Sequence, residues 1–224
     1  MSEQKFESLS DLVELRDVLQ EPYDDLINKL NNNTQNTQKY LFQAFCGIGK
    51  SRAMYKTIFD THYQLYAFVF PTLGLVEQFV NDYINNTDDG FGIMNDEEYD
   101  VSVICSTKEI KNKNIGIECT TNKKYINNLL DYKNKKIICV TYQSFETLNS
   151  VLKQKNMKID LAIFDEAHNS IGEKIHKNIY NDETYTRAVF FTATPKNNKN
   201  VSMFDRENPE KSMCGERVAN ITYL

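Results

Sequence analysis

Apolar residues gather in short runs that alternate with longer amphipathic stretches from residue 40 onward. The runs are rich in aromatic and β-branched residues and almost continuously apolar, which is typical of strands buried on both faces of a parallel sheet. They span 40–45, 65–70, 101–105, 136–140, 160–164 and 187–192, and 216–224 alternates like one closing strand. Stretches of helical length separate most of them, at 50–60, 72–85, 121–132, 142–154 and 168–180. This alternation predicts an α/β fold whose mostly parallel sheet is covered by helices on both faces.

The beginning of the chain follows a different pattern. Apolar residues at helical spacing predict a helix over 11–20 and a second short helix over 23–30. Pro22 predicts the break between them, because its ring clashes with the preceding turn and it lacks a backbone N–H. A polar tract then predicts a loop. We therefore expect an N-terminal helical extension, residues 1–37, ahead of the main domain, residues 38–224.

The length and composition are typical of a globular protein with a single hydrophobic core. Hydrophobic residues make up 41% of the 224 positions. No run approaches the roughly 18 apolar residues of a membrane helix, and the first residues do not resemble a signal peptide. The five cysteines lack Cys-x2-Cys spacing, which predicts reduced thiols and no zinc site. We therefore expect a cytoplasmic or nuclear protein in a reducing compartment.

Net charge gives no general attraction to nucleic acid, because 31 acidic residues outweigh 26 basic ones. Any binding of RNA or DNA must therefore come from a local surface. One candidate is the stretch 108–136, which carries eight lysines against three acidic groups, whereas 86–100 reads as an acidic loop. A solvated insertion explains the lysines as well as a binding patch does, so both interpretations stay open.

The segment 44–52 predicts a phosphate-binding loop between a strand and a helix. Gly47 and Gly49 permit a tight loop whose backbone N–H groups face a phosphate. Lys50 would reach the outer phosphates of a nucleotide, and the Ser51 hydroxyl would bind magnesium. The pattern begins with alanine rather than the usual glycine, so a chance surface turn stays open on this segment alone. The predicted nucleotide-binding residues are Ala44, Phe45, Cys46, Gly47, Ile48, Gly49, Lys50, Ser51 and Arg52.

Two consecutive carboxylates, Asp165 and Glu166, follow the apolar run 160–164. Neighbouring side chains at a strand end point in opposite directions, so the two can have different roles. Asp165 would hold magnesium opposite Ser51, and Glu166 would orient and deprotonate the water that attacks the terminal phosphate. With Lys50, these carboxylates are the predicted catalytic residues. Taken alone, the pair is also compatible with a solvated turn or a helix cap.

The tetrapeptide Asp165-Glu166-Ala167-His168 is a DEAH box. Together with the phosphate-loop segment 44–52, it resembles the first motor lobe of a superfamily 2 helicase, closest to the group of type III restriction-enzyme helicases and viral DEAH helicases. The resemblance implies a RecA-like lobe that binds ATP and Mg²⁺ and hydrolyses the ATP. It also implies a nucleic-acid partner and an ATP-dependent helicase or translocase.

Two segments resemble the family motifs that hold a strand of nucleic acid by its phosphates. Pro71 and Thr72 open a Pro-Thr-x-x-Leu-x-x-Gln sequence, and Thr141 lies in a second motif; 106–107 is a weaker counterpart. The resemblance therefore implies contacts to RNA or DNA without sequence preference. Both threonines are equally compatible with simple helix caps.

A third segment, 191–195, resembles the family motif that connects the ATP site to the nucleic-acid groove. The resemblance assigns this coupling to Thr192, Ala193 and Thr194. His168 of the DEAH box would be their contact on the nucleotide side. The motifs occur in the family's order, which is far more specific than any one of them.

Two features depart from the family pattern. Asp24 stands where the family often has a glutamine that reads adenine, with Gln20 or Gln38 as possible substitutes. The motifs of the second lobe do not follow Pro195, and that lobe supplies the arginine that stabilises transferred charge. We therefore expect full activity to need a second helicase lobe that these residues do not include. Either this is a fragment, with that lobe on another chain or reading frame, or it is a truncated relative.

Two alternatives to an active helicase lobe stay open. One is a nucleotide- or nucleic-acid-binding module without useful catalysis, such as a truncated helicase remnant. The other is a small-molecule kinase, which would need an acceptor site and a lid, and the motif at 191–195 argues against it.

Overall fold

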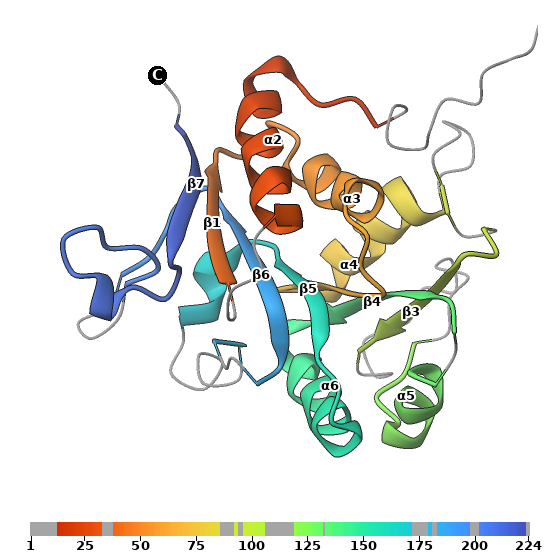
Figure 1. Cartoon of the computed structure of the whole chain (residues 1–224). Coiled ribbons are helices and arrows are strands. Elements are labelled where there is room, and N and C mark those ends of the chain that lie inside the picture. Colours follow the sequence, from red (N-terminus) through yellow and green to blue (C-terminus); the bar gives the residue numbers. More distant parts are fainter. Residues whose placement is uncertain are drawn as a thin grey trace, which may run out of the picture.

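The computed structural model contains a seven-stranded, all-parallel sheet in the order β3-β4-β2-β5-β6-β1-β7 (Figure 1). The described residues are 13–32, 38–85, 92–93, 96–105, 119–131, 133–171, 179–180, 183–197 and 202–222. The strands are β1 (Gln38–Ala44), β2 (Leu65–Phe70), β3 (Tyr99–Ile104), β4 (Lys135–Thr141), β5 (Ile159–Phe164), β6 (Tyr185–Thr192) and β7 (Glu216–Ile221). Each predicted strand is present, which confirms the parallel α/β prediction.

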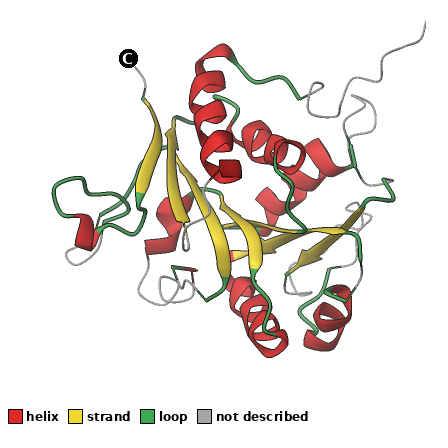
Figure 2. Ribbon diagram, viewed as in Figure 1, coloured by secondary structure: helices red, strands yellow, loops and turns green. Residues whose placement is uncertain are grey.

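Helices cover both faces of the sheet (Figure 2). One face carries α2 (Asp17–Asn32), α3 (Lys50–Asp60) and α4 (Leu73–Phe79), which continues as a π-helical turn over Val80–Ile84. The other face carries α5 (Lys123–Leu129) and α6 (Tyr142–Lys155). Two hydrophobic clusters, one on each face, therefore enclose the strands, as their continuous apolar runs require.

The N-terminal prediction of two helices broken at Pro22 is wrong. A single helix, α2, begins at Asp17 and runs through the proline. Its buried residues Leu19, Tyr23, Leu26 and Leu30 keep one apolar face in phase across that position. Pro22 removes the hydrogen bond to the carbonyl of residue 18, where the side chain is 51% exposed and water has access. Packing of the continuous face against the sheet outweighs that lost bond.

Other predicted helices differ from their expected bounds. The stretch 72–85 divides into α4 and the π-helical turn, and α5 is shorter than the predicted helix 121–132. Within the predicted helix 168–180, the described residues form a 3-10 turn over Ala167–Ile171 and are helical again at Ile179. Residues 172–178 lie outside the described residues. So do 106–107, residues 108–118 and 132 of the lysine-rich stretch, and residues 86–91 and 94–95 of the acidic stretch, and the structure does not address the predictions for these residues.

The carboxyl ends of the parallel strands meet at one edge of the sheet, which we call the carboxyl edge. It comprises the residues that follow Ala44, Thr192, Phe164, Phe70 and Thr141, in their spatial order from β1 to β4. All of the predicted motifs within the described residues therefore fall on one edge, where ligands bind in open parallel sheets.

Candidate functional site

The segment 46–49 forms the turn between β1 and α3 and has the backbone that a phosphate loop needs. Gly47 and Gly49 have φ values of 78° and 111°, in the region that favours glycine. A Cβ atom on Gly47 would have no neighbour within 4 Å, so this side of the loop is open to a ligand. Gly49 is the N-cap of α3, whose positive end therefore faces the same space.

Lys50, the first residue of α3, is folded back against the end of β1. Its Nζ donates to the carbonyl oxygens of Ala44 at 3.1 Å and Phe45 at 3.3 Å, and the side chain is only 7% exposed. A buried ammonium needs such partners. Phosphate oxygens are stronger acceptors than carbonyls, so a bound nucleotide can exchange these bonds for its own.

Asp165 follows β5 and is buried, with 6% of the residue exposed. Burial, together with the charge of Glu166, raises the pKa of its carboxyl to about 6. The backbone N–H of Glu166 and the charge of Lys50 act in the opposite direction. A buried carboxylate with a raised pKa is poised to accept a cation, and the chemistry of Asp165 and Ser51 fits Mg²⁺, which prefers oxygen ligands.

Glu166 adopts a backbone conformation that L-residues other than glycine rarely take, with φ of 45°. Its carboxylate lies 3.2 Å from Nδ1 of His168, and both side chains are partly buried. Backbone strain of this kind is found at functional sites, where the surroundings hold it in place. Here the strained residue is the one predicted to activate water.

His168 also reaches the end of β6. Its Nδ1 lies 3.1 Å from Oγ1 of Thr192, a fully buried hydroxyl that also accepts from the N–H of Thr194 at 3.3 Å. An ionised carboxylate can accept hydrogen bonds but cannot donate them. The contacts of Nδ1 with Glu166 and with Thr192 are therefore both attractive when Nδ1 carries the proton. The DEAH box and the segment 191–195 are thus joined by one imidazole.

The predicted nucleic-acid contacts lie farther along the carboxyl edge. Thr72 follows β2, Thr141 is the last residue of the paired strand β4, and each caps the next helix. The Thr72 hydroxyl accepts from Leu75 N at 3.3 Å, and the Thr141 hydroxyl accepts from Ser144 N at 3.4 Å. Thr72 is exposed, whereas Thr141 is buried, so only Thr72 presents its side chain at the surface here.

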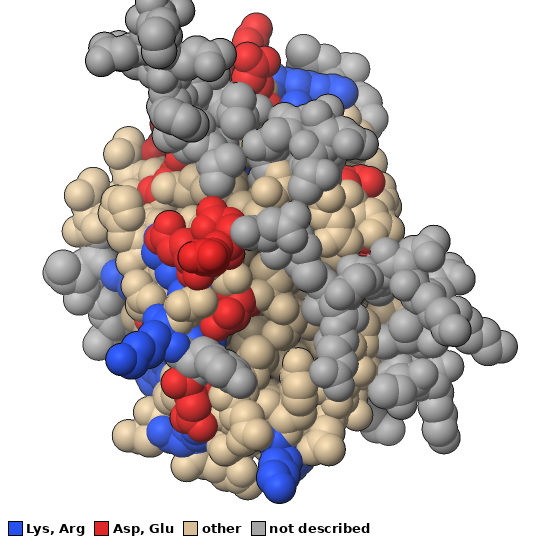
Figure 3. All heavy atoms as spheres, turned by 90° about the vertical axis from the view of Figure 1, so that its right-hand side faces the viewer, with Lys and Arg blue, Asp and Glu red and all other residues tan. Residues whose placement is uncertain are grey.

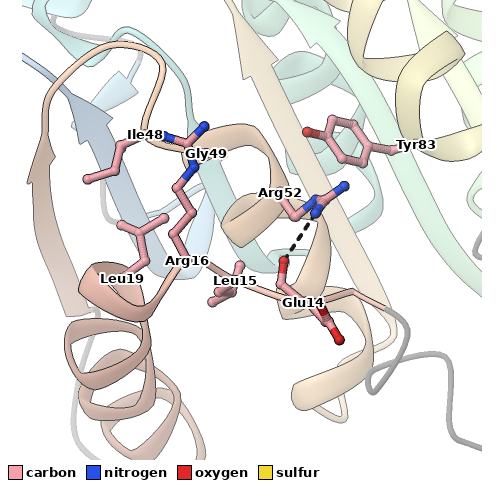
Figure 4. A pocket seen from close by; sticks show the side chains of 8 residues that line it. All are labelled: Glu14, Leu15, Arg16, Leu19, Ile48, Gly49, Arg52 and Tyr83. Atoms are coloured by element: carbon pink, nitrogen blue, oxygen red, sulfur yellow. Dashed lines mark hydrogen bonds between the residues drawn. The ribbon is translucent and has the colours of Figure 1, made fainter.

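A cavity of about 430 Å³ opens beside the phosphate loop (Figure 4). The guanidinium of Arg52 donates to the carbonyl oxygen of Glu14 at 3.3 Å and contacts the Tyr83 hydroxyl. On the opposite side, Leu19 lies against Ile48 and the loop. The lining residues are Glu14, Leu15, Arg16, Leu19, Ile48, Gly49, Arg52 and Tyr83. The cavity combines apolar walls with a few charged groups, as small-ligand sites commonly do.

Sequence comparison identifies the family of the chain. The family model described as "Type III restriction enzyme, res subunit" matches residues 12–197. The chain belongs to this family. Its fold is similar to the type ISP restriction-modification enzyme LlaGI, solved as a nuclease-deletion mutant with a DNA substrate mimic, with TM-score 0.65 and 20% identity over 91% of this chain. It is also similar to the Hef helicase domain of Pyrococcus furiosus, with TM-score 0.51 and 16% identity over 86%.

The chain spans 17% of the LlaGI chain and 35% of the Hef chain. A search of curated proteins gave no match. The restriction-enzyme res family and the two structural neighbours confirm the predicted RecA-like α/β lobe and its resemblance to the first motor lobe of superfamily 2 helicases.

The residues considered for adenine contact, Asp24, Gln20 and Gln38, are not among the described residues that line the cavity. Gln20 donates to Asp24 at 2.9 Å on the exposed side of α2. Gln38 accepts from the Tyr40 hydroxyl at the amino end of β1, away from the carboxyl edge. The cavity is lined by the segment before α2, by Leu19 of α2, by the phosphate loop and the start of α3, and by Tyr83 of the π-helical turn. No spacing rule in the sequence relates these segments to the phosphate loop.

The surface of this res-family lobe carries charges of both signs. On the face shown in Figure 3, acidic and basic side chains lie side by side among the described residues. Two lysines of the stretch 108–136 are engaged locally: Lys135 pairs with Glu98, and Lys136 donates to the carbonyl of Asn134 at 2.9 Å. Among the described helices, none combines the length and apolarity needed to cross a bilayer.

Proposed function

We propose that the chain is the ATP-binding and ATP-hydrolysing lobe of a DEAH-type nucleic-acid helicase or translocase. The observation that carries the proposal is the convergence of Lys50, Asp165 and Glu166 on the carboxyl edge, with His168 joining them to Thr192. Each group alone has a structural explanation. Together they supply a phosphate-binding cation, a metal-binding carboxylate and a base in one place.

The triphosphate would lie along the phosphate loop, where backbone N–H groups and the start of α3 favour anions. Lys50 would exchange its two carbonyl partners for the outer phosphates, and Ser51 and Asp165 would hold Mg²⁺, which neutralises charge that develops on the phosphates. The nucleobase would enter the cavity between Leu19 and Tyr83. Placement of the base there is supported by the cavity's contact with Gly49, the last loop residue.

Hydrolysis would begin at the Glu166 carboxylate. It would accept one proton from a water whose oxygen forms a bond to the terminal phosphorus, while the bond from that phosphorus to the bridging oxygen breaks. ADP and inorganic phosphate are the products. His168 holds the Glu166 carboxylate at 3.2 Å and so limits its rotation. A second lobe would add the arginine that stabilises the transferred charge.

Polynucleotide would bind at the other end of the carboxyl edge, next to Pro71, Thr72 and Thr141. Contacts there would go to RNA or DNA phosphates and would carry no sequence preference. His168 and the segment 192–194 lie between this end and the phosphate loop, because β5 and β6 separate β2 from β1. Their position supports a role in coupling the two sites.

The test is ATP hydrolysis by the purified chain with and without single-stranded RNA and DNA. Lys50→Ala and Glu166→Gln serve as controls that remove phosphate binding and the base, respectively. Polynucleotide-stimulated turnover that both controls abolish is the expected result. Nucleotide binding without turnover would instead favour a binding module that needs a partner lobe, and turnover that survives both substitutions would refute the assignment.

A further inference from the structure

Tyr142 connects the corner between β4 and α6 to the Asp165–Glu166 dipeptide. Its hydroxyl donates to the backbone carbonyl oxygen of Asp165 at 2.9 Å, and the bond is buried. Tyr142 is the first residue of α6 and directly follows Thr141, the cap of that helix. The bond therefore spans from β4 across the end of β2 to β5.

Ring packing holds the hydroxyl in place. The ring of Tyr142 stacks on Phe164, the last residue of β5, with centroids 6.2 Å apart and an interplanar angle of 22°. Burial raises the pKa of Tyr142 well above its ordinary value.

The accepting carbonyl belongs to the peptide unit that links Asp165 to Glu166. That unit is planar, so its C=O and N–H move together. The N–H of Glu166 donates to the Asp165 carboxylate, and Tyr142 holds the opposite end of the same peptide. On the other side of Asp165, its own N–H donates to the carbonyl of Val69 at 2.9 Å. The dipeptide is therefore fixed from β2 and from α6.

Fixing the 165–166 peptide matters because the backbone of Glu166 is strained. Its φ of 45° is unfavourable for a side chain with a Cβ atom. Rotation of the 165–166 peptide would relieve this conformation and would turn the Glu166 N–H away from the Asp165 carboxylate, which accepts from it. The Tyr142 hydroxyl opposes that rotation, because rotation would leave the buried carbonyl without its partner.

We infer that Tyr142 is a positioning residue that couples polynucleotide binding at the β4–α6 corner to the placement of Asp165 and Glu166. The inference rests on the proposed function. A strand that contacts the exposed part of this corner, at Gln143, would act on the first turn of α6, where Tyr142 lies, and thereby on the carbonyl of Asp165. By linkage, Mg²⁺–nucleotide at Asp165 would favour the same arrangement of the corner.

Tyr142→Phe is the test variant, and Tyr185→Phe is its matched control. Tyr185 is also buried, donates its hydroxyl to a backbone carbonyl, that of Ile179, at 2.7 Å, and contacts the same Phe164 ring at 6.0 Å. Each substitution deletes one buried hydroxyl from the same aromatic group. They differ in that one hydroxyl holds Asp165 and the other does not.

The first measurement is the affinity for a fluorescent ADP analogue with and without Mg²⁺. Tyr142→Phe should weaken binding of the Mg²⁺ form by roughly 3- to 10-fold, leave the metal-free form unchanged, and reduce the effect of a single-stranded oligonucleotide on that affinity. Tyr185→Phe should behave as the unmodified chain does. Equal effects of the two variants, or no oligonucleotide effect in the unmodified chain, overturn the coupling.

The second measurement separates this inference from the proposed function. Hydrogen exchange of the Glu166 amide should be roughly 3- to 10-fold faster in Tyr142→Phe than in Tyr185→Phe, without any nucleotide. Absence of nucleotide binding in the unmodified chain would refute the proposed function on its own. Equal exchange in the two variants would refute the positioning role of Tyr142, whatever the nucleotide results.

Discussion

Asp165 should destabilise the fold at neutral pH, so Asp165→Asn should stabilise the chain while removing its magnesium ligand. The folded pKa of about 6 lies above the ordinary value of 3.8. Between these values the folded chain retains a proton that the unfolded chain has lost, so stability is fully present below pH 3.8 and falls as pH rises. Above pH 6 the cost reaches about 3 kcal/mol.

An asparagine at 165 avoids this cost and still offers an oxygen to the N–H of Glu166. The folded pKa of about 6 already includes the attraction to Lys50, so about 3 kcal/mol is the upper limit of the gain. We expect Asp165→Asn to raise the free energy of unfolding at pH 7.5 by about 1 to 3 kcal/mol, and the gain to shrink by about 2 kcal/mol at pH 4.5. Urea denaturation at the two pH values measures both quantities.

Asp160→Asn is the control, because Asp160 lies in the same strand near its opposite end. Its carboxylate accepts from the N–H groups of Gln64 and Leu65, each at 3.0 Å. This substitution weakens two charge-assisted hydrogen bonds and should lower stability by about 1 kcal/mol at pH 7.5. The reasoning is refuted if Asp165→Asn destabilises the chain at pH 7.5, or if its effect is the same at both pH values.

Three further predictions follow from the site. Gly49→Ala should lower the free energy of unfolding, measured in urea, by about 1 to 2 kcal/mol because residue 49 has a φ of 111°; the added Cβ would meet Leu19 at an ordinary 3.5 Å, so the cost comes from the backbone. The control Gly74→Ala lies within helix α4 and should be neutral or stabilising. Thr192→Val should reduce polynucleotide stimulation of ATP hydrolysis by about tenfold, with nucleotide affinity unchanged in a titration. GTP should compete with ATP within about tenfold in a displacement assay, because the described lining of the cavity includes no amide side chain.

The sequence predicts the sheet and the motif positions well, because both depend on local signals. Buried parallel strands need continuous apolar runs, and 65–70 is buried at all six positions. A phosphate loop needs glycines at fixed spacing, and Gly47 and Gly49 do have positive φ. Such requirements depend on a few consecutive residues, so they can be recognised in the sequence without knowledge of the tertiary structure.

Other features depend on tertiary contacts, and there the sequence misleads or gives nothing. Pro22 is a strong local break signal, but the apolar face from Leu19 to Leu30 continues through it. The cavity joins Arg16 to Tyr83, two residues that no periodicity relates. Thr141 reads as a phosphate contact in a motif, yet its side chain is buried beneath the start of α6. In each case packing decides what a local pattern leaves open.

The strand order explains why the Asp165–Glu166 dipeptide is the point at which the two ends of the carboxyl edge meet. β5 lies between β2, on the proposed polynucleotide side, and β6, on the nucleotide side. The dipeptide after β5 accordingly receives one hydrogen bond from each direction: Tyr142 holds its backbone, and His168, anchored on Thr192, holds its side chain. A structural change at the polynucleotide end of the carboxyl edge must alter the Tyr142 contact before it affects the nucleotide end, and a change at the nucleotide end must alter the His168 contact before it affects the polynucleotide end. The strained backbone of Glu166 makes the dipeptide sensitive to both, so coupling between polynucleotide and ATP should be lost when either contact is removed.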